Sequence, residues 1–183
     1  MTTKTVIAGI GGQGVLSMGR VLAMALWAAG RTTTYLPAHG GQVRGGVVSC
    51  TVAAGRHEIA SPVASTPDIL VMMSPPSILR HLPVLARGGL MLVNSSQPLA
   101  PPPGRGIRLG CLPASELAQK AGNPKAANLV MLGALAAAGE LVDPKTIMDA
   151  LAGAGLAGGD KMLEINRQAL ELGSRAGSGL FLR

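Results

Sequence analysis

The chain has 183 residues, a formal net charge of +7 and an apolar fraction of 48%, so a single domain with a sizeable core is expected. One Trp, one Tyr and one Phe leave little material for stacking bases, and the basic residues form no run, which argues against nucleic-acid binding. No apolar run approaches the ~18 residues needed to cross a membrane, and no signal-peptide pattern is present. We therefore expect a cytoplasmic protein.

The positive charge is concentrated in the first third of the chain. No acidic residue precedes Glu58, so the basic residues up to that point are unopposed: Lys4, Arg20, Arg31, Arg44 and Arg56. Such an excess favours a face that meets phosphates, a carboxylate or an acidic protein. The alternative is a solvated basic surface that serves solubility alone.

Cysteine and histidine residues offer no local site. Cys50 and Cys111 lie far apart without a C-x-x-C spacing, which excludes an iron–sulfur or zinc site built from local ligands. The histidines His39, His57 and His81 are unclustered. We therefore assign no metal ligand and no catalytic residue to this chain.

The most informative stretch is a glycine-rich turn near the N-terminus. The apolar run 5–10 predicts a buried strand, and helical periodicity begins at Val15. Between them lie the candidate binding residues Gly9, Gly11, Gly12, Gln13 and Gly14. Glycine permits positive φ and close backbone approach, and the N-terminus of the next helix offers N–H groups to an anion.

Gly9, Gly11 and Gly14 also satisfy G-x-G-x-x-G, the dinucleotide fingerprint. That fingerprint expects an acidic residue about 20 positions later, to hold a ribose 2′-hydroxyl. None is present near Tyr35, although Arg31 can meet a 2′-phosphate. An NADP-binding enzyme of Rossmann type therefore stays open as an alternative.

A second glycine-rich loop surrounds one arginine. It follows a predicted strand at 32–36 and contains the candidate binding residues Arg44, Gly45 and Gly46. We interpret it as a loop that packs its backbone closely and points Arg44 at an anion; the alternative is a flexible surface loop. The next strand, 47–53, is expected to form a hairpin with 57–61 through a turn at Gly55 and Arg56.

The rest of the chain alternates between strands and helices. Strands are expected at 68–73, 90–93 and 107–112, with a proline-started helix from Pro75 between the first two. Residues 98–106 are interpreted as a loop, and the chain from Pro113 onward as helical, ending in a helix at 161–172. The pattern predicts an α/β three-layer sandwich with a mostly parallel, partly mixed central sheet and a Rossmann-like first turn, in a single domain over 1–183.

Two asparagines lie within apolar helical segments. Asn128 and Asn166 are costly there unless their amides are hydrogen-bonded. A structural bond to a loop or sheet end and a role in ligand or subunit contact are both open.

Four segments, in order along nearly the whole chain, resemble the gamma subunit of 2-oxoacid:ferredoxin oxidoreductases. They are the strand with its Gly-Ile-Gly-Gly-Gln-Gly turn, the Arg44-Gly45-Gly46 segment, the Asn128-x-x-x-Leu132-Gly133 helix and the Glu164-x-Asn166-x-x-Ala169 segment. One departure is that no acidic residue precedes Arg44. Gln42 at that place leans toward the aryl-pyruvate branch of the family.

The resemblance implies oxidative decarboxylation of a 2-oxoacid with coenzyme A (CoA) to acyl-CoA and carbon dioxide, with electrons passed to ferredoxin. It implies that thiamine diphosphate, Mg²⁺ and iron–sulfur clusters are held by partner subunits (alpha, beta and a ferredoxin-like delta). This chain would then be inactive alone, help to position CoA and assemble the complex. We expect that the isolated chain can form a homodimer. Besides the NADP-binding enzyme, a further alternative for the whole protein is a basic docking module for an acidic partner protein.

Overall fold

The computed structural model describes residues 2–38, 46–97, 106–139, 141–155 and 158–180. Within these ranges the strands form one six-stranded sheet, in the order β2-β3-β1-β4-β5-β6. The predicted Arg44 and Gly45, like His39, lie outside the described residues. The strands are β1 (Thr3–Ile10), β2 (Thr32–Ala38), β3 (Val47–Gly55), β4 (Ile69–Met72), β5 (Leu90–Asn94) and β6 (Arg108–Leu112).

The sheet is mixed, as expected, but its antiparallel pairs involve other strands than the predicted hairpin of 47–53 with 57–61. β1, β4, β5 and β6 pair in parallel, whereas β3 lies between β2 and β1 and is antiparallel to both. The predicted hairpin partner at 57–61 is wrong, because those residues form no strand. β3 instead finds its hydrogen bonds with β2 before it and with β1, where Val47 lies opposite Ile10.

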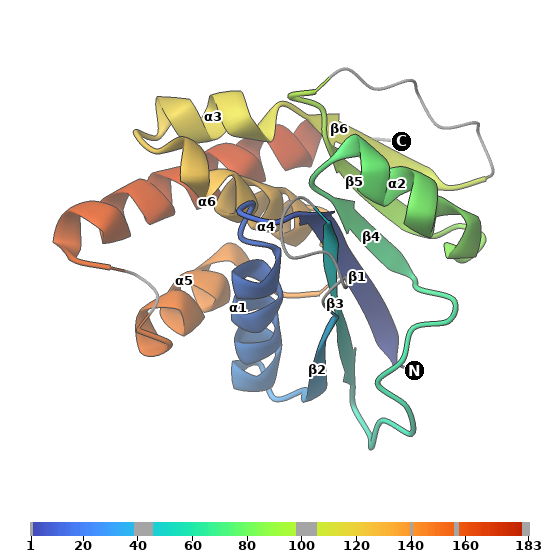
Figure 1. Ribbon diagram of the computed structural model, residues 1–183. Helices are drawn as coiled ribbons and strands as arrows, with labels where there is room; N and C mark the ends of the chain where they lie inside the picture. The colour runs from blue at the N-terminus through green and yellow to red at the C-terminus, as the bar shows by residue number, and fades with distance from the viewer. Residues whose placement is uncertain (1, 39–45, 98–105, 140, 156–157, 181–183) are drawn as a thin grey trace.

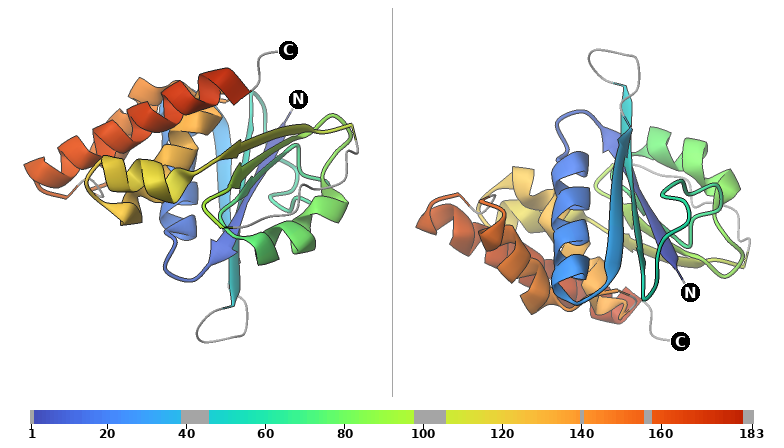
Figure 2. Two further views of the ribbon diagram at one scale, coloured as in Figure 1. Left: turned by 90° about the horizontal axis from the view of Figure 1, so that it is seen from above. Right: turned by 90° about the horizontal axis from the view of Figure 1, so that it is seen from below.

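Helices cover both faces of the sheet unequally, as Figure 1 and Figure 2 show. One face carries α2 (Pro75–His81), which continues into the short turn η1 (Leu82–Val84). The other face carries the remaining helical segments: α1 (Val15–Ala28), α3 (Ala114–Lys120), η2 (Pro124–Ala126), α4 (Ala127–Ala137), α5 (Pro144–Gly153) and α6 (Asp160–Leu180). The three-layer arrangement and the helical C-terminal third are therefore confirmed.

The two layers bury separate aliphatic clusters. Alternate residues of β1 point to opposite faces, so Ile7 joins the large cluster under α1 and α4, while Val6 and Ala8 join the smaller one under α2. The start of α4 is buried nearly all round. None of the described helices is long and apolar enough to cross a membrane.

α4 and α6 approach each other through glycines. Cβ atoms placed on Gly133 or Gly173 would lie well inside van der Waals contact with the backbone of the facing helix, and one on Gly177 would lie 2.6 Å from Ala134 Cα. α6 runs to Leu180, beyond the predicted end at Leu172, and Gly173 and Gly177 are packing positions within it.

Candidate functional site

The carboxyl ends of the parallel strands meet at one edge of the sheet, where open α/β sheets bind ligands. β1 ends there at Ile10, and the glycine-rich turn follows it. β4 ends at Met72 and β5 at Asn94, so segments far apart in sequence share this edge. We call it the carboxyl edge.

The glycine-rich turn presents open backbone. Gly12 and Gly14 have φ values of 94° and 71°, in the left-handed region that favours glycine. Among the described residues, no atom other than those of the chain neighbours lies within 4 Å of the place where a side chain on Gly11 or Gly12 would begin. Gly14 is the N-cap of α1 and supplies no side-chain bond to the first turn, which also holds no acidic residue. The N–H groups of that turn are thus available to an anion.

A cavity of about 390 Å³ lies directly on this turn, and we call it the glycine cavity. It is lined by Ile10, Gly11, Gly12, Gly14, Val15, Leu16, Ser17 and Val48. Val48 belongs to β3, so the strand that follows the second glycine-rich loop contributes a wall. Gly46, the one predicted residue of that loop within the described ranges, directly precedes β3 at this edge. Arg44 is three residues along the chain from Val47.

Gly9 and Gln13 have a different role from Gly11 and Gly12. Gln13 Oε1 accepts a bond from the Ile10 N–H at 2.9 Å, and Gln13 Nε2 donates to the Met73 carbonyl at 3.1 Å. A Cβ on Gly9 would lie 2.5 Å from Gln13 Oε1 and 2.8 Å from Met73 Cβ. Gly9 and Gln13 therefore join the end of β1 to the segment after β4. Both the oxygen and the nitrogen of the Gln13 amide are hydrogen-bonded to backbone groups.

Sequence reasoning missed the polar residues at the end of β5 and after β6. Asn94 is 5% exposed, and its Oδ1 accepts bonds from the N–H groups of Ser96 and Ala114, which fixes the start of α3. Its Nδ2 donates to Ser115 Oγ at 3.3 Å. A polar residue ending a buried strand was the available signal, because such residues gather at the carboxyl edge.

Ser115 and Lys125 complete a second cavity of about 210 Å³, the lysine cavity, beside the glycine turn. Its lining is Gly12, Gln13, Met73, Asn94, Ser115, Pro124, Lys125 and Ala127. At the same edge Ser96 Oγ donates to the Glu116 carboxylate, and this bond lowers the pKa of Glu116. The edge thus combines amide donors, one lysine and one exposed carboxylate.

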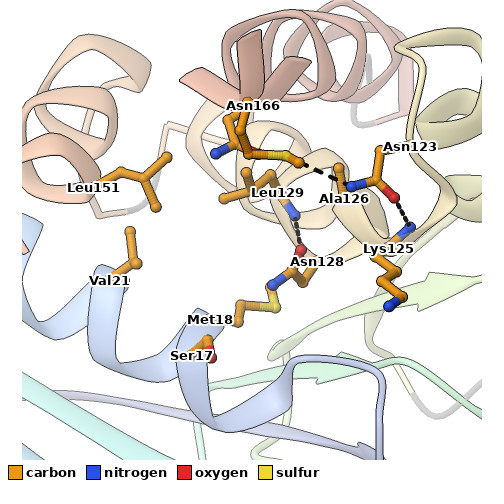
Figure 3. Close-up of a pocket in the computed structure, with 11 residues that line it drawn as sticks. Ser17, Met18, Val21, Asn123, Lys125, Ala126, Asn128, Leu129, Leu151 and Asn166 are labelled. Carbon is orange, nitrogen blue, oxygen red and sulfur yellow. Dashed lines mark hydrogen bonds between the residues drawn. The ribbon is translucent and has the colours of Figure 1, made fainter. Parts of the chain in front are cut away.

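Asn128 and Asn166 both line a third cavity, which Figure 3 shows between α1, α4, α5 and α6. Asn128 Nδ2 lies 3.5 Å from the Gly14 carbonyl, so this helix residue touches the glycine turn. Gly14 has no room for a side chain, because its Cβ would lie 2.6 Å from Asn128 Nδ2. The structural interpretation of Asn128 is therefore supported, and the cavity leaves the ligand interpretation open.

The strand order bears on the dinucleotide alternative. In a Rossmann sheet the second strand lies beside the first, so that its end reaches the ribose of a ligand held by the first turn. Here β3 separates β2 from β1, which puts the end of β2 two strands, about 10 Å, from the turn. The end of β2 therefore lies farther from the glycine turn than the second strand of a Rossmann sheet does.

The cysteines differ in environment. Cys50 is buried against α1, and desolvation raises the pKa of its thiol to about 12. Cys111 is exposed on β6, with a pKa raised by partial desolvation. Within the described ranges, no three His, Cys, Asp or Glu side chains gather as metal ligands would.

Comparisons with known proteins agree with the resemblance seen in the sequence. Residues 4–176 match the family described as pyruvate ferredoxin/flavodoxin oxidoreductase. The ketoisovalerate oxidoreductase subunit VorA of Methanothermobacter thermautotrophicus is 40% identical over 169 residues, which cover 92% of this chain and 35% of VorA. The chain thus spans about a third of the length of this curated relative.

Two solved structures share the fold. The gamma subunit of a keto/oxoacid ferredoxin oxidoreductase from Geobacter sulfurreducens superposes with a TM-score of 0.87 at 22% identity, covering 98% of both chains. A 2-oxoglutarate:ferredoxin oxidoreductase from Magnetococcus marinus, with 2-oxoglutarate, CoA and succinyl-CoA bound, gives 0.89 at 20% identity, covering 98% of this chain and 31% of that one. With its glycine turn, its mixed sheet and this match over nearly its whole length, the chain belongs to the pyruvate ferredoxin/flavodoxin oxidoreductase family.

Proposed function

We propose that the chain is the gamma-type subunit or domain of a 2-oxoacid:ferredoxin oxidoreductase, and that its carboxyl edge holds a phosphate of CoA. The reaction is oxidative decarboxylation of the 2-oxoacid to acyl-CoA and carbon dioxide, with electrons passed to ferredoxin. The observation that carries the proposal is the open backbone at Gly11 and Gly12, directly before the uncapped start of α1. Backbone N–H groups at a helix N-terminus bind phosphate well.

Positive side chains support the same assignment. Lys125 lines the lysine cavity together with Gly12, so an ammonium group accompanies the amides. Arg44, three residues from Val47, is proposed to add a guanidinium that bonds the phosphate in a charge-assisted pair. The CoA-bound relative from Magnetococcus marinus shows that this fold occurs in a protein that binds CoA.

The division of labour follows from what the chain offers. Its described residues contain no cluster of metal ligands, so iron–sulfur clusters, Mg²⁺ and thiamine diphosphate are proposed to reside on alpha, beta and ferredoxin-like delta partners. In this proposal the chain positions CoA, helps to assemble the catalytic subunits in the cytoplasm, and is inactive alone. No residue of it is proposed to be catalytic.

The first experiment is purification of the tagged chain from its own host. Co-elution of thiamine diphosphate- and cluster-binding chains, with viologen reduction that requires both a 2-oxoacid and CoA, is the expected result. A solitary chain that binds NADP tightly would overturn the proposal. Loss of the partners as ionic strength rises through the physiological range would favour the basic docking module instead.

The second experiment tests the residues within the purified complex. Arg44→Ala should raise the KM for CoA about 10- to 100-fold, since a hydrogen bond to a charged group contributes about 1.5–3 kcal/mol. Gly11→Ala should also raise the KM, because its methyl group enters space that is open in the free chain. Gly153→Ala is the control, at another glycine where no described atom outside its own helix turn lies within 4 Å of the added Cβ. An unchanged KM in both variants would refute the phosphate assignment.

A further inference from the structure

β2 is an edge strand with little protection on its outer side. It stands at one end of the sheet order, and among the described strands it pairs with β3 alone. Proteins commonly guard such edges with charged side chains, a bulge or a covering segment. The sequence of β2, Thr-Thr-Thr-Tyr-Leu-Pro-Ala, carries no charge. Its outer backbone groups are therefore positioned to bond another strand.

The bonds of the neighbouring strands show which residues of β2 point outward. Backbone direction alternates along a strand, and the carbonyls of residues 4 and 8 on β1 accept bonds from residues that flank β4. Ile7 therefore bonds to Cys50 on β3, which leaves the backbone groups of Cys50 turned away from β2. Pro37, opposite Cys50, thus points outward, where its missing N–H costs no bond to β3. The same alternation points the N–H and C=O groups of Thr33 and Tyr35 outward.

A groove beside this edge contains an exposed aromatic side chain. It has a volume of about 250 Å³, and we call it the Trp27 groove. Figure 2 shows α1 running alongside β2 at this end of the sheet. Trp27 is 74% exposed, and tryptophan is one of the residues that dominate the binding energy of protein interfaces. The lining comes from α1 and β2: Arg20, Ala23, Met24, Trp27, Thr33 and Tyr35.

The charge around the groove is positive. Arg20 lines the groove, Arg31 directly precedes β2, and no acidic residue occurs in the chain before Glu58. A second copy of this chain would bring the same positive groups to the edge, and like charges that face each other across paired strands are destabilising. Charge complementarity therefore favours an acidic occupant over a second copy.

The direction of α1 sets the order of side chains that fits the edge. α1 and β2 are joined by residues 29–31 and run in opposite directions (Figure 1), so Trp27 lies near the start of β2 and Arg20 about 10 Å farther along it. Arg31 lies at the opposite end of the edge from Arg20. Side chains on one face of an added strand are about 7 Å apart. A segment with an acidic, an apolar and an acidic residue at alternate positions thus matches this surface.

We propose that β2 and the Trp27 groove bind an extended acidic segment of a partner protein, which joins the sheet as a seventh strand. The backbone groups of Thr33 and Tyr35 bond the segment. An apolar side chain packs on Trp27, and acidic side chains pair with the two arginines. Trp27 lies about 20 Å beyond Gly14 along α1, so binding here is independent of the phosphate assignment at the glycine turn.

The test titrates the full chain, labelled with ¹⁵N, with a capped peptide of sequence Thr-Glu-Thr-Val-Thr-Glu-Thr. This peptide has the alternation described above and reads the same in both strand directions. The amide signals of Thr33 and Tyr35 should shift in a saturable manner, and their exchange with deuterium should slow, because their N–H groups gain acceptors. The matched peptide with Lys in place of Glu should leave these signals unchanged.

Two pairs of variants locate the contact. Thr33→Pro removes an outward N–H and keeps the bonds to β3, as Pro37 does, so it should weaken binding of the acidic peptide at least about fivefold. Thr33→Val, which keeps that N–H, should bind as the unchanged chain does. Trp27→Ala should also weaken binding at least about fivefold, whereas Leu79→Ala, at an 81% exposed position on α2, should not. Because Trp27 is exposed, its replacement keeps the test valid even if Thr33→Pro does not fold.

Several results would overturn the proposal. An absence of shifts at Thr33 and Tyr35 with the acidic peptide, or equal shifts with the lysine peptide, would refute the acidic occupant. An unchanged affinity in both Thr33→Pro and Trp27→Ala would refute the location. In sedimentation of the free chain, a concentration-dependent dimer that Thr33→Pro abolishes and Thr33→Val retains would make a second copy the occupant instead.

Discussion

Replacing Gln13 by Ala tests whether this residue belongs to the architecture of the glycine turn or to its ligand. The change removes the bonds from the Ile10 N–H and to the Met73 carbonyl. At about 1 kcal/mol net for each bond, the free energy of unfolding should fall by about 2 kcal/mol. For a chain of this size, that corresponds to a melting temperature lower by about 4–8 °C.

Gln13→Glu refines the same prediction. The glutamate keeps the acceptor for Ile10 but turns a carboxylate oxygen, rather than an N–H, toward the Met73 carbonyl. Its loss of stability at pH 7 should therefore shrink near pH 4, where the protonated carboxyl can donate again.

Urea unfolding followed by circular dichroism measures the effect, with CoA titration of the same samples. Gln119→Ala serves as the control, because Gln119 is exposed. The reasoning is refuted if Gln13→Ala leaves the unfolding midpoint and slope unchanged while it weakens CoA binding. That result would make Gln13 a ligand-binding residue after all.

Gly177→Ala should destabilise the protein by about 1–3 kcal/mol in thermal unfolding, because its Cβ would lie 2.6 Å from Ala134 Cα and push α4 from α6. Gly179 lies on the same helix, and no described atom outside its own helix turn lies within 4 Å of a Cβ added there, so Gly179→Ala should be neutral or stabilising. Equal losses in both variants would contradict this packing account. Burial lowers the pKa of His81 below 6.5 in the folded chain, so the unfolded chain binds the proton more readily. The stability due to neutral His81 is thus present above pH 6.5 and lost as the pH falls through the folded pKa. His81→Gln should make the free energy of unfolding in urea less dependent on pH, measured at pH 7 and below. An unchanged pH profile in this variant would contradict the assignment to His81.

The sequence predicted elements better than it predicted their partners. The strands at β1, β4 and β5 were found because buried parallel strands are continuous apolar runs. The pairing of β3 was missed because an apolar run does not say which neighbour it hydrogen-bonds. The helix predicted at 161–172 was too short, because α6 continues through Gly173 and Gly177, where the backbone of α4 approaches.

The candidate site was predicted only in part, because sequence patterns reveal residues that are adjacent in the chain and not those that the fold brings together. A local motif revealed the glycine turn, since its residues are adjacent in sequence. Asn94 ends β5, Ser115 lies in α3 and Lys125 in η2, so only the fold brings them to the same edge. Gln13 lay within the motif, but its bond to Met73, 60 residues away, could not be read from neighbouring residues.

The central position of β1 has a consequence for biosynthesis. β1 leaves the ribosome before both of its neighbours: Ile10 pairs with Val47, and Thr5 pairs with Ile69, 64 residues later. At about 5–20 residues per second, one edge of this apolar strand waits roughly 3–13 s for its parallel partner. During that interval its unpaired N–H and C=O groups can hydrogen-bond to other nascent chains. The central strand of the sheet is therefore also the strand most exposed to misassembly during synthesis.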